Sequence, residues 1–568
     1  MKLFRKIQKW FENQENLYYL FLIILIVPNI VLCFTEPMPL VAKVCNVLLP
    51  FSIYHMIMSW SGNCGKTFWI LFPFLFFGAF QIVLLYLFGQ SVIAVDMFLN
   101  LVTTNPGEAL ELLDNLIPAI IIVVLLYIPA LILAAVAVSK KWKLSETFVH
   151  RERKRARITV IAGILSLVAA YLFDARYELK SDLYPANVCY NIALAFQRTA
   201  QTQHYAETSN DFTFQAKTTR PEKNREVYVM VIGETSRAAN WSIYGYNRNT
   251  NPELTKIKGL TAFSHVLTES NTTHKSVPML MSSVTAHDFN SIYRQKGIIT
   301  AFKEAGYRTA FFSNQRYNHS FIDFFGKEAD ICDFIKEDTG DGSYNPSDDE
   351  LLKLVAAELA ENASKQFIVL HTYGSHFNYR ERYPADNAFF LPDFPVDAEL
   401  KYKDNLINAY DNSIRYTDNF LARLIRMLQE QDIDTAMLYT SDHGEDIFDD
   451  DRHLFLHASP VPSYYQIHVP FLIWMSDNYR KNYPDFFKNA EINRQKNISS
   501  SASFFQTMLE LGGIDTPCRN DSLSVINASY TEKNRVYLND HNEARSLNDI
   551  GMREEDFTML QMKGIVYR

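Results

Sequence analysis

The stretch 227–252, VYVMVIGETSRAANWSIYGYNRNTNP, decides the fold of the second half of this chain. It opens with an apolar run rich in β-branched residues, which predicts a buried strand over Val227–Ile232. Gly233 and Glu234 follow directly, so the Glu234 carboxylate is expected at the carboxyl end of that strand. In open α/β sheets, ligands bind outside the carboxyl ends of the strands. The stretch therefore indicates an α/β domain with a site near Glu234.

The residues after 225 continue this pattern of short apolar runs separated by longer helical segments, as an α/β domain requires. Further strands are expected at Arg308–Phe312, Phe367–Leu370, Ala436–Tyr439 and Phe471–Trp474. Helices are expected at Thr300–Ala305, Asp348–Glu361, Ala398–Gln429 and Ser501–Leu511. A capping box between Ser347 and Glu350 is expected to start the second helix. We place this domain at residues 225–568.

Most long apolar runs of the 568-residue chain lie before residue 176. A helix that crosses a bilayer needs about 20 mostly apolar residues. The candidate spans are Leu17–Phe34, Leu40–Trp60, Thr67–Phe88, Leu116–Val138 and Ile158–Phe173. Buried helices of a soluble domain are the alternative, but five such runs leave too little polar sequence for a soluble surface. We therefore expect a five-helix membrane domain at 1–175, then an interfacial helix and linker at 176–224.

Lysine and arginine residues set the expected orientation of these spans. Four basic residues lie in the first nine positions, and eight lie between Lys140 and Arg157. Both segments are expected to be cytoplasmic by the positive-inside rule. Five spans then place everything after Phe173 outside the cytoplasm, and the first apolar run is interpreted as an uncleaved anchor.

Composition restricts the function further. A net charge of −8 gives no support to nucleic-acid binding. The six cysteines include no C-x-x-C pair and no zinc-finger spacing. Only Cys189, Cys332 and Cys518 lie beyond the apolar runs, so at most one disulfide is available there.

Carboxylates and imidazoles follow several of the expected strands, as Glu234 does. The further residues are His371, His376, Asp442, His443 and His457. Such groups are rarely buried without a partner, so packing alone does not explain their places at strand ends. Asp442 and His443 offer one hard oxygen and one borderline nitrogen, a mix that suits Zn²⁺ or Mn²⁺ better than Ca²⁺. A structural role is the simpler interpretation of any single histidine, but the set favours a metal site.

A nucleophile is expected in the hydroxyl-rich stretch 267–283, LTESNTTHKSVPMLMSS. A threonine hydroxyl is a weak nucleophile in water, but a divalent cation at its oxygen favours the alkoxide. Thr273 is the first candidate and Thr272 the second, and spacing alone does not choose between them. The loop after the third span contains 104–108, TNPGE. It is either a plain polar connector, or Asn105 and Glu108 hold a lipid headgroup.

Together these residues resemble the phosphoethanolamine transferases that modify lipid A and related surface glycans, which belong to the alkaline phosphatase and sulfatase superfamily. The resemblance covers nearly the whole chain. Its motifs are Gly233-Glu234-Thr235, Tyr244-Gly245-Tyr246, Thr250-Asn251-Pro252, Thr273-x-x-Ser276-Val277-Pro278, Gly374-Ser375-His376, Tyr410-Asp411-Asn412-Ser413, Ser441-Asp442-His443-Gly444-Glu445 and Leu456-His457. Each motif is weak alone, but the ordered set is specific.

The resemblance implies a fold and a location. The fold is an N-terminal five-span α-helical membrane domain followed by an α/β sulfatase-like domain of the alkaline phosphatase type. The protein would be a multi-pass protein of the bacterial inner membrane with its catalytic domain in the periplasm. It also implies a site for Zn²⁺, with one or two ions and Mn²⁺ as an alternative, whose ligands are Glu234, Thr273, Asp442 and His443.

The implied reaction has two halves. The Thr273 alkoxide would attack the phosphorus of phosphatidylethanolamine and release diacylglycerol. A lipid A phosphate or a core oligosaccharide hydroxyl would then take the phosphoethanolamine from the threonine. The residues that match substrate or second-metal positions of the family are His376, His457, Asn105 and Glu108.

The chain departs from the family at three points. The cysteines that many members place around the nucleophile are replaced by Glu269-Ser270-Asn271 and Pro278-Met279-Leu280. His376 is followed by Phe377-Asn378 instead of Gly-Pro, and the family's phosphate-binding lysine has no counterpart in Asn314–Lys327. These departures leave the acceptor open.

Three other functions share parts of this sequence pattern. A sulfatase needs a C/S-x-P-x-R pentapeptide for its formylglycine, and none occurs here. A phosphoglycerol transferase of the lipoteichoic-acid type shares five spans and a threonine nucleophile, but the Asn105/Glu108 loop and the Thr-x-x-Ser-Val-Pro context favour phosphoethanolamine. A catalytically inactive membrane-anchored sensor is expected to have lost at least one of the four ligands, and all four are present.

Overall fold

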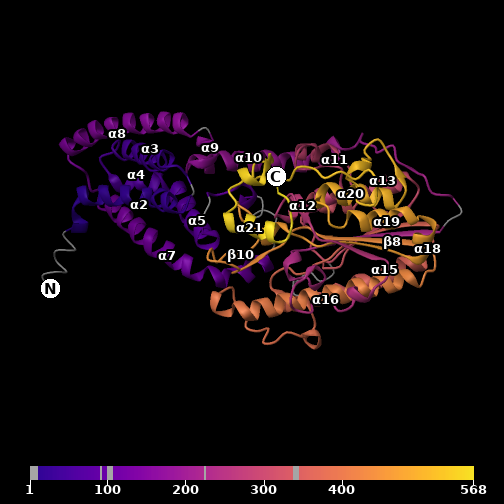
Figure 1. Ribbon diagram of the computed structural model, residues 1–568. Helices are drawn as coiled ribbons and strands as arrows, with labels where there is room; N and C mark the ends of the chain where they lie inside the picture. Colours follow the sequence, from indigo (N-terminus) through magenta and orange to yellow (C-terminus); the bar gives the residue numbers. More distant parts are fainter. Residues whose placement is uncertain are drawn as a thin grey trace. The chain divides into compact units, whose positions relative to one another are not determined.

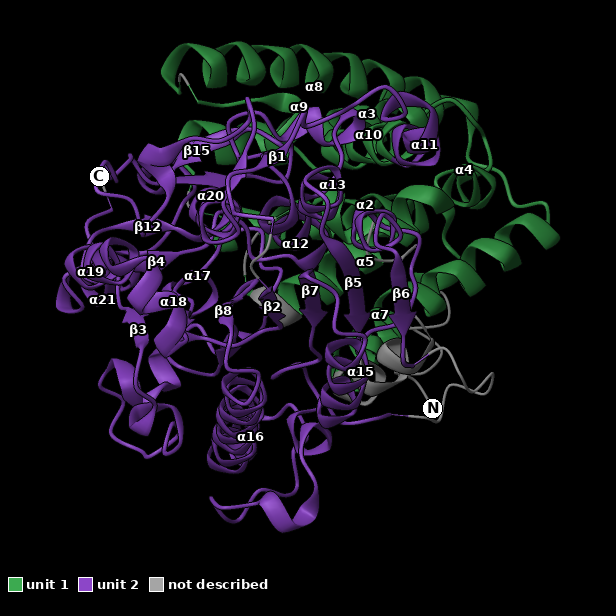
Figure 2. Cartoon of the chain, turned by 90° about the vertical axis from the view of Figure 1, so that its right-hand side faces the viewer, with its two compact units in different colours: residues 1–102, 109–198 green, residues 103–108, 199–568 purple. Residues whose placement is uncertain are grey.

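The computed structural model describes residues 10–36, 38–89, 92–98, 106–174, 176–222, 225–336 and 345–567, without the side chains of 87–88 and 106–115. The chain divides into two compact units (Figures 1 and 2). Unit 1 comprises residues 1–102 and 109–198, and unit 2 comprises residues 103–108 and 199–568. Unit 1 is helical, and unit 2 contains the sheet.

Within the described residues of unit 1, four helices are long and apolar enough to cross a membrane. They are α2 (Gln14–Thr35), α3 (Leu40–Met58), the 116–139 part of α7 (Pro106–Ser139), and α8 (Glu146–Phe173). The expected third span is instead a bent pair, α4 (Cys64–Ile70) and α5 (Phe72–Phe88), which meet at 62°. Pro73 lies in the first turn of α5. Because proline has no backbone N–H, it cannot make the hydrogen bond that would continue α4 into α5. The pair adds a fifth span only if its two parts cross together.

The central sheet of unit 2 has seven strands in the order β3-β11-β8-β2-β7-β5-β6 (Figure 2). Their bounds are β2 Glu226–Gly233, β3 Leu260–Phe263, β5 Arg308–Ser313, β6 Ile331–Phe334, β7 Lys365–His371, β8 Asp434–Ser441 and β11 Phe471–Met475. The strands from β8 to β6 are parallel, and β11 is antiparallel to both β8 and β3. Ile232 of β2 pairs with His371 of β7, and Gly233 pairs with Ser441 of β8. The carboxyl ends of these three strands therefore lie side by side.

Helices cover both faces of the sheet (Figure 2). One core contains Tyr228, Met230 and Ile232 of β2, and the other contains the alternate residues Val227, Val229 and Val231. The first core includes residues of α12 (Thr273–Met281), α13 (Ile298–Glu304) and α20 (Ser500–Leu511). The second includes residues of α15 (Asp349–Ala360) and α16 (Lys403–Gln429). Burial on both faces explains why the opening stretch is continuously apolar rather than alternating.

The start of α15 corrects one expectation. The capping box between Ser347 and Glu350 is absent, because Asp348 is the N-cap and its side chain makes no cap hydrogen bond. Its carboxylate instead accepts hydrogen bonds from the backbone N–H groups of Tyr373, at 2.8 Å, and Gly374, at 3.0 Å. Asp348 thus anchors the loop that follows β7, and this tertiary contact replaces the local cap.

The two units contain further helices and short strands. They are α9 Leu179–Asp182, α10 Ala186–Gln203, α11 Tyr205–Thr208, β1 Lys217–Thr218, β4 Val266–Leu267, α14 Phe321–Gly326, β9 Asp446–Ile447, β10 Phe455–Leu456, α17 Tyr464–Ile467, α18 Asp477–Asn482, α19 Pro484–Asn493, β12 Ile498–Ser499, β13 Ile514–Asp515, β14 Val536–Leu538, β15 Ala544–Ser546 and α21 Glu554–Met562. Helix α10 overlaps the connector in which a helix was expected. All six cysteines are free thiols, so the structure has no disulfide among 189, 332 and 518.

Candidate active site

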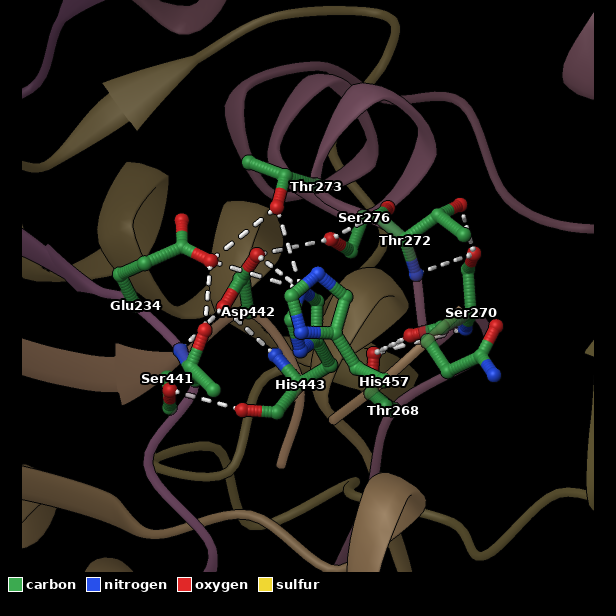
Figure 3. Close-up of polar contacts among 12 residues, drawn as sticks. Glu234, Thr268, Ser270, Thr272, Thr273, Ser276, Ser441, Asp442, His443 and His457 are labelled. Atoms are coloured by element: carbon green, nitrogen blue, oxygen red, sulfur yellow. Dashed lines mark hydrogen bonds and ion pairs between the residues drawn. The ribbon is translucent and has the colours of Figure 1, made fainter. Parts of the chain in front are cut away.

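Glu234, Asp442 and His443 meet at the carboxyl ends of β2 and β8 (Figure 3). Each side chain offers one metal-ligating atom, and these atoms lie within 4.8 Å of one another. His443 Nε2 is 3.1 Å from Asp442 Oδ2 and 3.5 Å from Glu234 Oε1. All three residues are buried. The structure thus brings together three of the four expected ligands.

The backbone around Glu234 is closely constrained. Thr235 has φ +60°, which is uncommon for a β-branched residue. Its N–H donates to Asp442 Oδ1 at 3.1 Å, and its hydroxyl donates to Glu234 Oε1 at 2.8 Å. Gly374, with φ +53°, approaches so closely that a Cβ there would lie 2.7 Å from the Glu234 carbonyl oxygen. These contacts hold Glu234 in one position, and backbone outliers of this kind cluster at functional sites.

Thr273 is the first residue of α12, and its hydroxyl faces the cluster (Figure 3). Its Oγ1 lies 3.1 Å from Glu234 Oε1 and 3.1 Å from His443 Nε2. The Thr272 hydroxyl instead pairs with Ser270 Oγ at 3.1 Å. The geometry therefore favours Thr273 over Thr272. Its place at a helix N-terminus also favours negative charge on the oxygen.

The electrostatics of the cluster fit a divalent cation. Burial, and next the charge of Asp442, raise the pKa of Glu234 to about 7. Burial raises the pKa of Asp442 to about 6 and lowers the pKa of His443 to about 3. A cation would offset the repulsion between two buried carboxylates and would accept the lone pair of a neutral imidazole. Two carboxylate oxygens, one imidazole nitrogen and the Thr273 hydroxyl oxygen together offer four donor atoms, the number that tetrahedral Zn²⁺ takes.

His457 lies against the cluster, with its ring centroid 4.2 Å from that of His443. Its Nδ1 is 2.9 Å from Glu445 Oε2, and Glu445 also accepts a hydrogen bond from the Tyr379 hydroxyl. Burial opposes charge on the His457 ring, but the bond to Glu445 and the nearby carboxylates outweigh it and raise its pKa. Glu445 therefore orients the His457 ring. Sequence reasoning gave Glu445 no role.

His376 is a third imidazole near the cluster, after His443 and His457. Its ring stacks on Tyr373 at 5.1 Å and lies 6.0 Å from the His457 ring, measured between centroids. Lys336 Nζ and Arg382 Cζ lie 3.0 Å and 4.0 Å from the centroid of the same Tyr373 ring. Burial, followed by the charges of His457 and Arg382, lowers the pKa of His376. A neutral His376 beside two cations suits an anionic substrate group.

Two further residues contact Glu234. Gln315 Nε2 donates to Glu234 Oε2 at 2.9 Å, and His371 Nε2 lies 4.0 Å from the same oxygen. His371 is one of the strand-end imidazoles named from the sequence, but the resemblance gave it no role. Gln315 was not predicted, although it also closely follows a strand end.

Two expected substrate residues lie outside the described part of the chain. Asn105 is not described, and Glu108 lies in helix α7 with a side chain that is not described. Their role stays a prediction.

Comparison with known proteins assigns a family to the second unit. Residues 226–514 match the Sulfatase family. Among curated proteins, phosphoethanolamine transferase EptA of Escherichia coli O157:H7 is 27% identical over 495 residues, which cover 83% of this chain and 87% of the relative. The Kdo(2)-lipid A phosphoethanolamine 7''-transferase of E. coli K12 is 33% identical over 285 residues, covering 48% and 47%. The chain spans about half the length of several curated relatives, this one among them.

Solved structures match the fold. The integral membrane lipooligosaccharide phosphoethanolamine transferase A (EptA) of Neisseria meningitidis matches with a TM-score of 0.71 at 21% identity, covering 90% of this chain and 97% of that one. The periplasmic domain of EptC from E. coli, in complex with Zn, matches with a TM-score of 0.54 at 24% identity, covering 59% and 96%. The resemblance inferred from the motifs is confirmed. The fold class, apolar membrane helices followed by a sulfatase-like domain, is confirmed as well.

Proposed function

The chain belongs to the sulfatase family, and from that premise we propose that it transfers phosphoethanolamine from phosphatidylethanolamine to a lipid A phosphate or a core glycan. The observation that carries this proposal is the Thr273 hydroxyl, 3.1 Å from both Glu234 Oε1 and His443 Nε2. A hydroxyl held between a carboxylate and an imidazole is the arrangement of an activated nucleophile. The curated relatives named as phosphoethanolamine transferases support the choice of transferred group.

Glu234, Thr273, Asp442 and His443 would together hold the metal. A Zn²⁺ ion bound there would lower the pKa of the threonine hydroxyl and stabilise negative charge on the phosphoryl oxygens. The choice of zinc rests on the two-carboxylate, one-imidazole donor set and on the matching EptC domain, which was solved with zinc.

Thr273, Glu234 and His457 have different roles in the first half-reaction. The Thr273 hydroxyl donates toward Glu234 Oε1, which orients the oxygen for attack on the phosphorus and takes the hydroxyl proton as it attacks. As the bond between Thr273 Oγ1 and phosphorus forms, the bond from phosphorus to the diacylglycerol oxygen breaks. His457, held by Glu445 and carrying a raised pKa, supplies a proton to that leaving oxygen.

The second half-reaction reverses the same steps. An acceptor oxygen attacks the phosphorus, and Thr273 Oγ1 leaves and regains its proton from Glu234 Oε1. His457 in its neutral form takes the acceptor proton, as microscopic reversibility requires. His376, with Lys336 and Arg382 behind its stacking partner, lies where it could contact an anionic acceptor. A catalytic domain on the outer side of the bacterial inner membrane would give access to both lipids there.

The proposal is tested by reconstituting the purified protein with zinc in vesicles of phosphatidylethanolamine. Acid-quenched samples are digested and analysed by mass spectrometry for phosphoethanolamine on the peptide that contains Thr273. We expect Thr273→Ala to abolish the adduct and diacylglycerol release while zinc stays bound through the other three ligands. Thr272→Ala is the matched control, because its hydroxyl contacts Ser270, and it should retain activity.

Three results would contradict the proposal. An adduct on another residue would remove Thr273 as the nucleophile. Consumption of phosphatidylglycerol instead of phosphatidylethanolamine would indicate a phosphoglycerol transferase, and zinc binding with no lipid consumed would indicate an inactive sensor. Mass spectrometry of lipid A and core oligosaccharide from cells with and without the protein then identifies the acceptor.

A further inference from the structure

Gln315 fills the space between Glu234 and His371 on the side away from Thr273. Its Nε2 is 2.9 Å from Glu234 Oε2, 3.2 Å from the Thr372 carbonyl oxygen and 3.2 Å from His371 Nε2. Gln315 follows the end of β5, His371 ends β7, and Glu234 follows β2. Three strand ends therefore converge on one amide nitrogen.

The orientation of this amide follows from its partners. A carboxylate oxygen and a carbonyl oxygen accept hydrogen bonds only, so the group between them must be the NH₂ of Gln315 and not its oxygen. His371 Nε2 is then an acceptor too, and its Nδ1 carries the proton toward Ser313 Oγ at 3.3 Å. The two N–H groups of the amide are thus shared among three acceptors, Glu234 Oε2, His371 Nε2 and the Thr372 carbonyl oxygen.

The three acceptors around the amide are also metal ligands by type. Glu234 Oε2 and His371 Nε2 are 4.0 Å apart. Two ligands of one tetrahedral zinc ion are about 3.4 Å apart at ordinary bond lengths, so a shift of about half an ångström would let them share an ion. Glu234 would then bridge two ions, because its Oε1 faces Thr273 and the first site. The Gln315 amide lies within hydrogen-bond distance of all three acceptor atoms, so it would compete with an ion for them.

We propose that Gln315 closes a second cation position formed by Glu234, His371 and Thr372, and that it thereby keeps Glu234 as a ligand of a single ion. This position uses neither His376 nor His457. The inference rests on the proposed metal centre at Glu234, Asp442 and His443. The two oxygens of Glu234 would then have different partners. Oε1 contacts the Thr273 hydroxyl and would bind the first metal, whereas Oε2 accepts a hydrogen bond from Gln315.

The test changes the amide into a ligand. Gln315→Glu places a carboxylate beside Glu234 Oε2 and His371 Nε2, and this set of two carboxylates and one imidazole suits Zn²⁺. We expect this variant to bind one more zinc ion per chain than the unchanged protein, at the same buffered free zinc concentration. The full-length protein in detergent is measured by elemental analysis after gel filtration. Gln429→Glu, an exposed position on α16 with the same charge change, should add no ion.

A second substitution assigns the added ion to this position. His371→Asn in the Gln315→Glu background should remove the added ion and return the zinc content to that of the unchanged protein. Gln315→Leu fills the same space without a hydrogen-bond donor, so it releases Glu234 Oε2. We expect it to leave the zinc content unchanged but to weaken zinc binding about 10- to 100-fold, the effect typical of losing an outer-shell partner. The dissociation constant is measured by competition with a chromophoric chelator.

The possible results distinguish a failure of the second cation position from a failure of the proposed metal centre. An unchanged zinc content in Gln315→Glu, or an added ion that survives His371→Asn, would overturn the second position. A second ion in the unchanged protein that disappears in His371→Asn would show that Gln315 does not close it. A protein that binds no zinc at all would refute the proposed metal centre itself, and the inference with it. If Gln315→Glu does not fold, a normal zinc affinity in Gln315→Leu still refutes the positioning role.

Discussion

Zinc binding at this centre should weaken steeply as the pH falls from 8 to 5, and the carboxylates should set that dependence. A metal binds the deprotonated ligands, so protons compete with it. Glu234 has a pKa raised to about 7 and Asp442 one raised to about 6, whereas burial lowers that of His443 to about 3. In a site with unperturbed groups, the histidine has the highest pKa, near 6.5, and the carboxylates titrate near 4, so protons compete with the metal mainly at the histidine.

The expected size follows from these values. At pH 5, competition from a proton with a pKa of about 7 costs about 100-fold in zinc affinity, and one with a pKa of about 6 costs about ten-fold. Because Glu234 and Asp442 influence each other, we expect a total loss of about 10² to 10³ between pH 8 and pH 5. At pH 6 the two carboxyl groups together should release more than one proton per zinc bound, which a single histidine cannot do. A site governed by a histidine of ordinary pKa would lose about 30-fold and release about 0.8 protons.

Calorimetric titration with zinc in buffers of different ionisation enthalpy counts the released protons, and chelator competition gives the affinities. His457 is a second titrating group close to the cluster, and its raised pKa adds a release of the same sign. The measurements are therefore made on His457→Gln as well as on the unchanged protein. A release of 0.8 protons or fewer at pH 6 in His457→Gln, with a loss of affinity near 30-fold, would refute the assignment of the proton competition to the carboxylates.

Two further substitutions test how the site is built. Gly374→Ala would place a Cβ 2.7 Å from the Glu234 carbonyl oxygen, so we expect it to destabilise the protein by about 1–3 kcal/mol and to weaken zinc binding. Gly551→Ala is its control, because it also has positive φ but no such close approach, and chemical denaturation of both compares them. Glu445→Gln removes the charge that raises the pKa of His457, so the alkaline limb of the rate profile should shift to lower pH with unchanged zinc content. A shift in zinc content instead of the profile would assign Glu445 to metal binding.

Five of the seven strands of the central sheet could be predicted from sequence, because each is an apolar run that ends in a polar residue. Strands β3 and β6, which have four residues each and lie at the two edges of the sheet, were not predicted. Val227–Ile232 is the clearest case, and Glu234 directly follows its end. The order of the strands could not be predicted, and it alone decides that Asp442 meets Glu234. The choice between Thr272 and Thr273 also needed the structure, because it depends on which hydroxyl lies at the first residue of α12.

The break in the third span shows a different limit. Pro73 lies at the bend between α4 and α5, but Pro28 in α2 and Pro50 in α3 lie inside helices that continue. Neighbouring helices and local adjustments can satisfy the backbone groups that a proline frees within a membrane. A proline therefore indicates where a helix can break, and the packing around it decides whether it does.

The pH dependence of zinc binding and the proposed role of Gln315 both involve the Glu234 carboxylate. The hydrogen bond from Gln315 lowers the pKa of Glu234 against the larger effect of burial. Gln315→Leu should therefore raise that pKa further and move the fall in zinc affinity to higher pH. Protonation weakens binding only where the carboxyl group is protonated, whereas lost positioning weakens it at every pH. If Gln315→Leu binds zinc normally at pH 9 and weakly at pH 7, its effect is on the charge of Glu234, and if it binds weakly at both, Gln315 also holds the carboxylate in place.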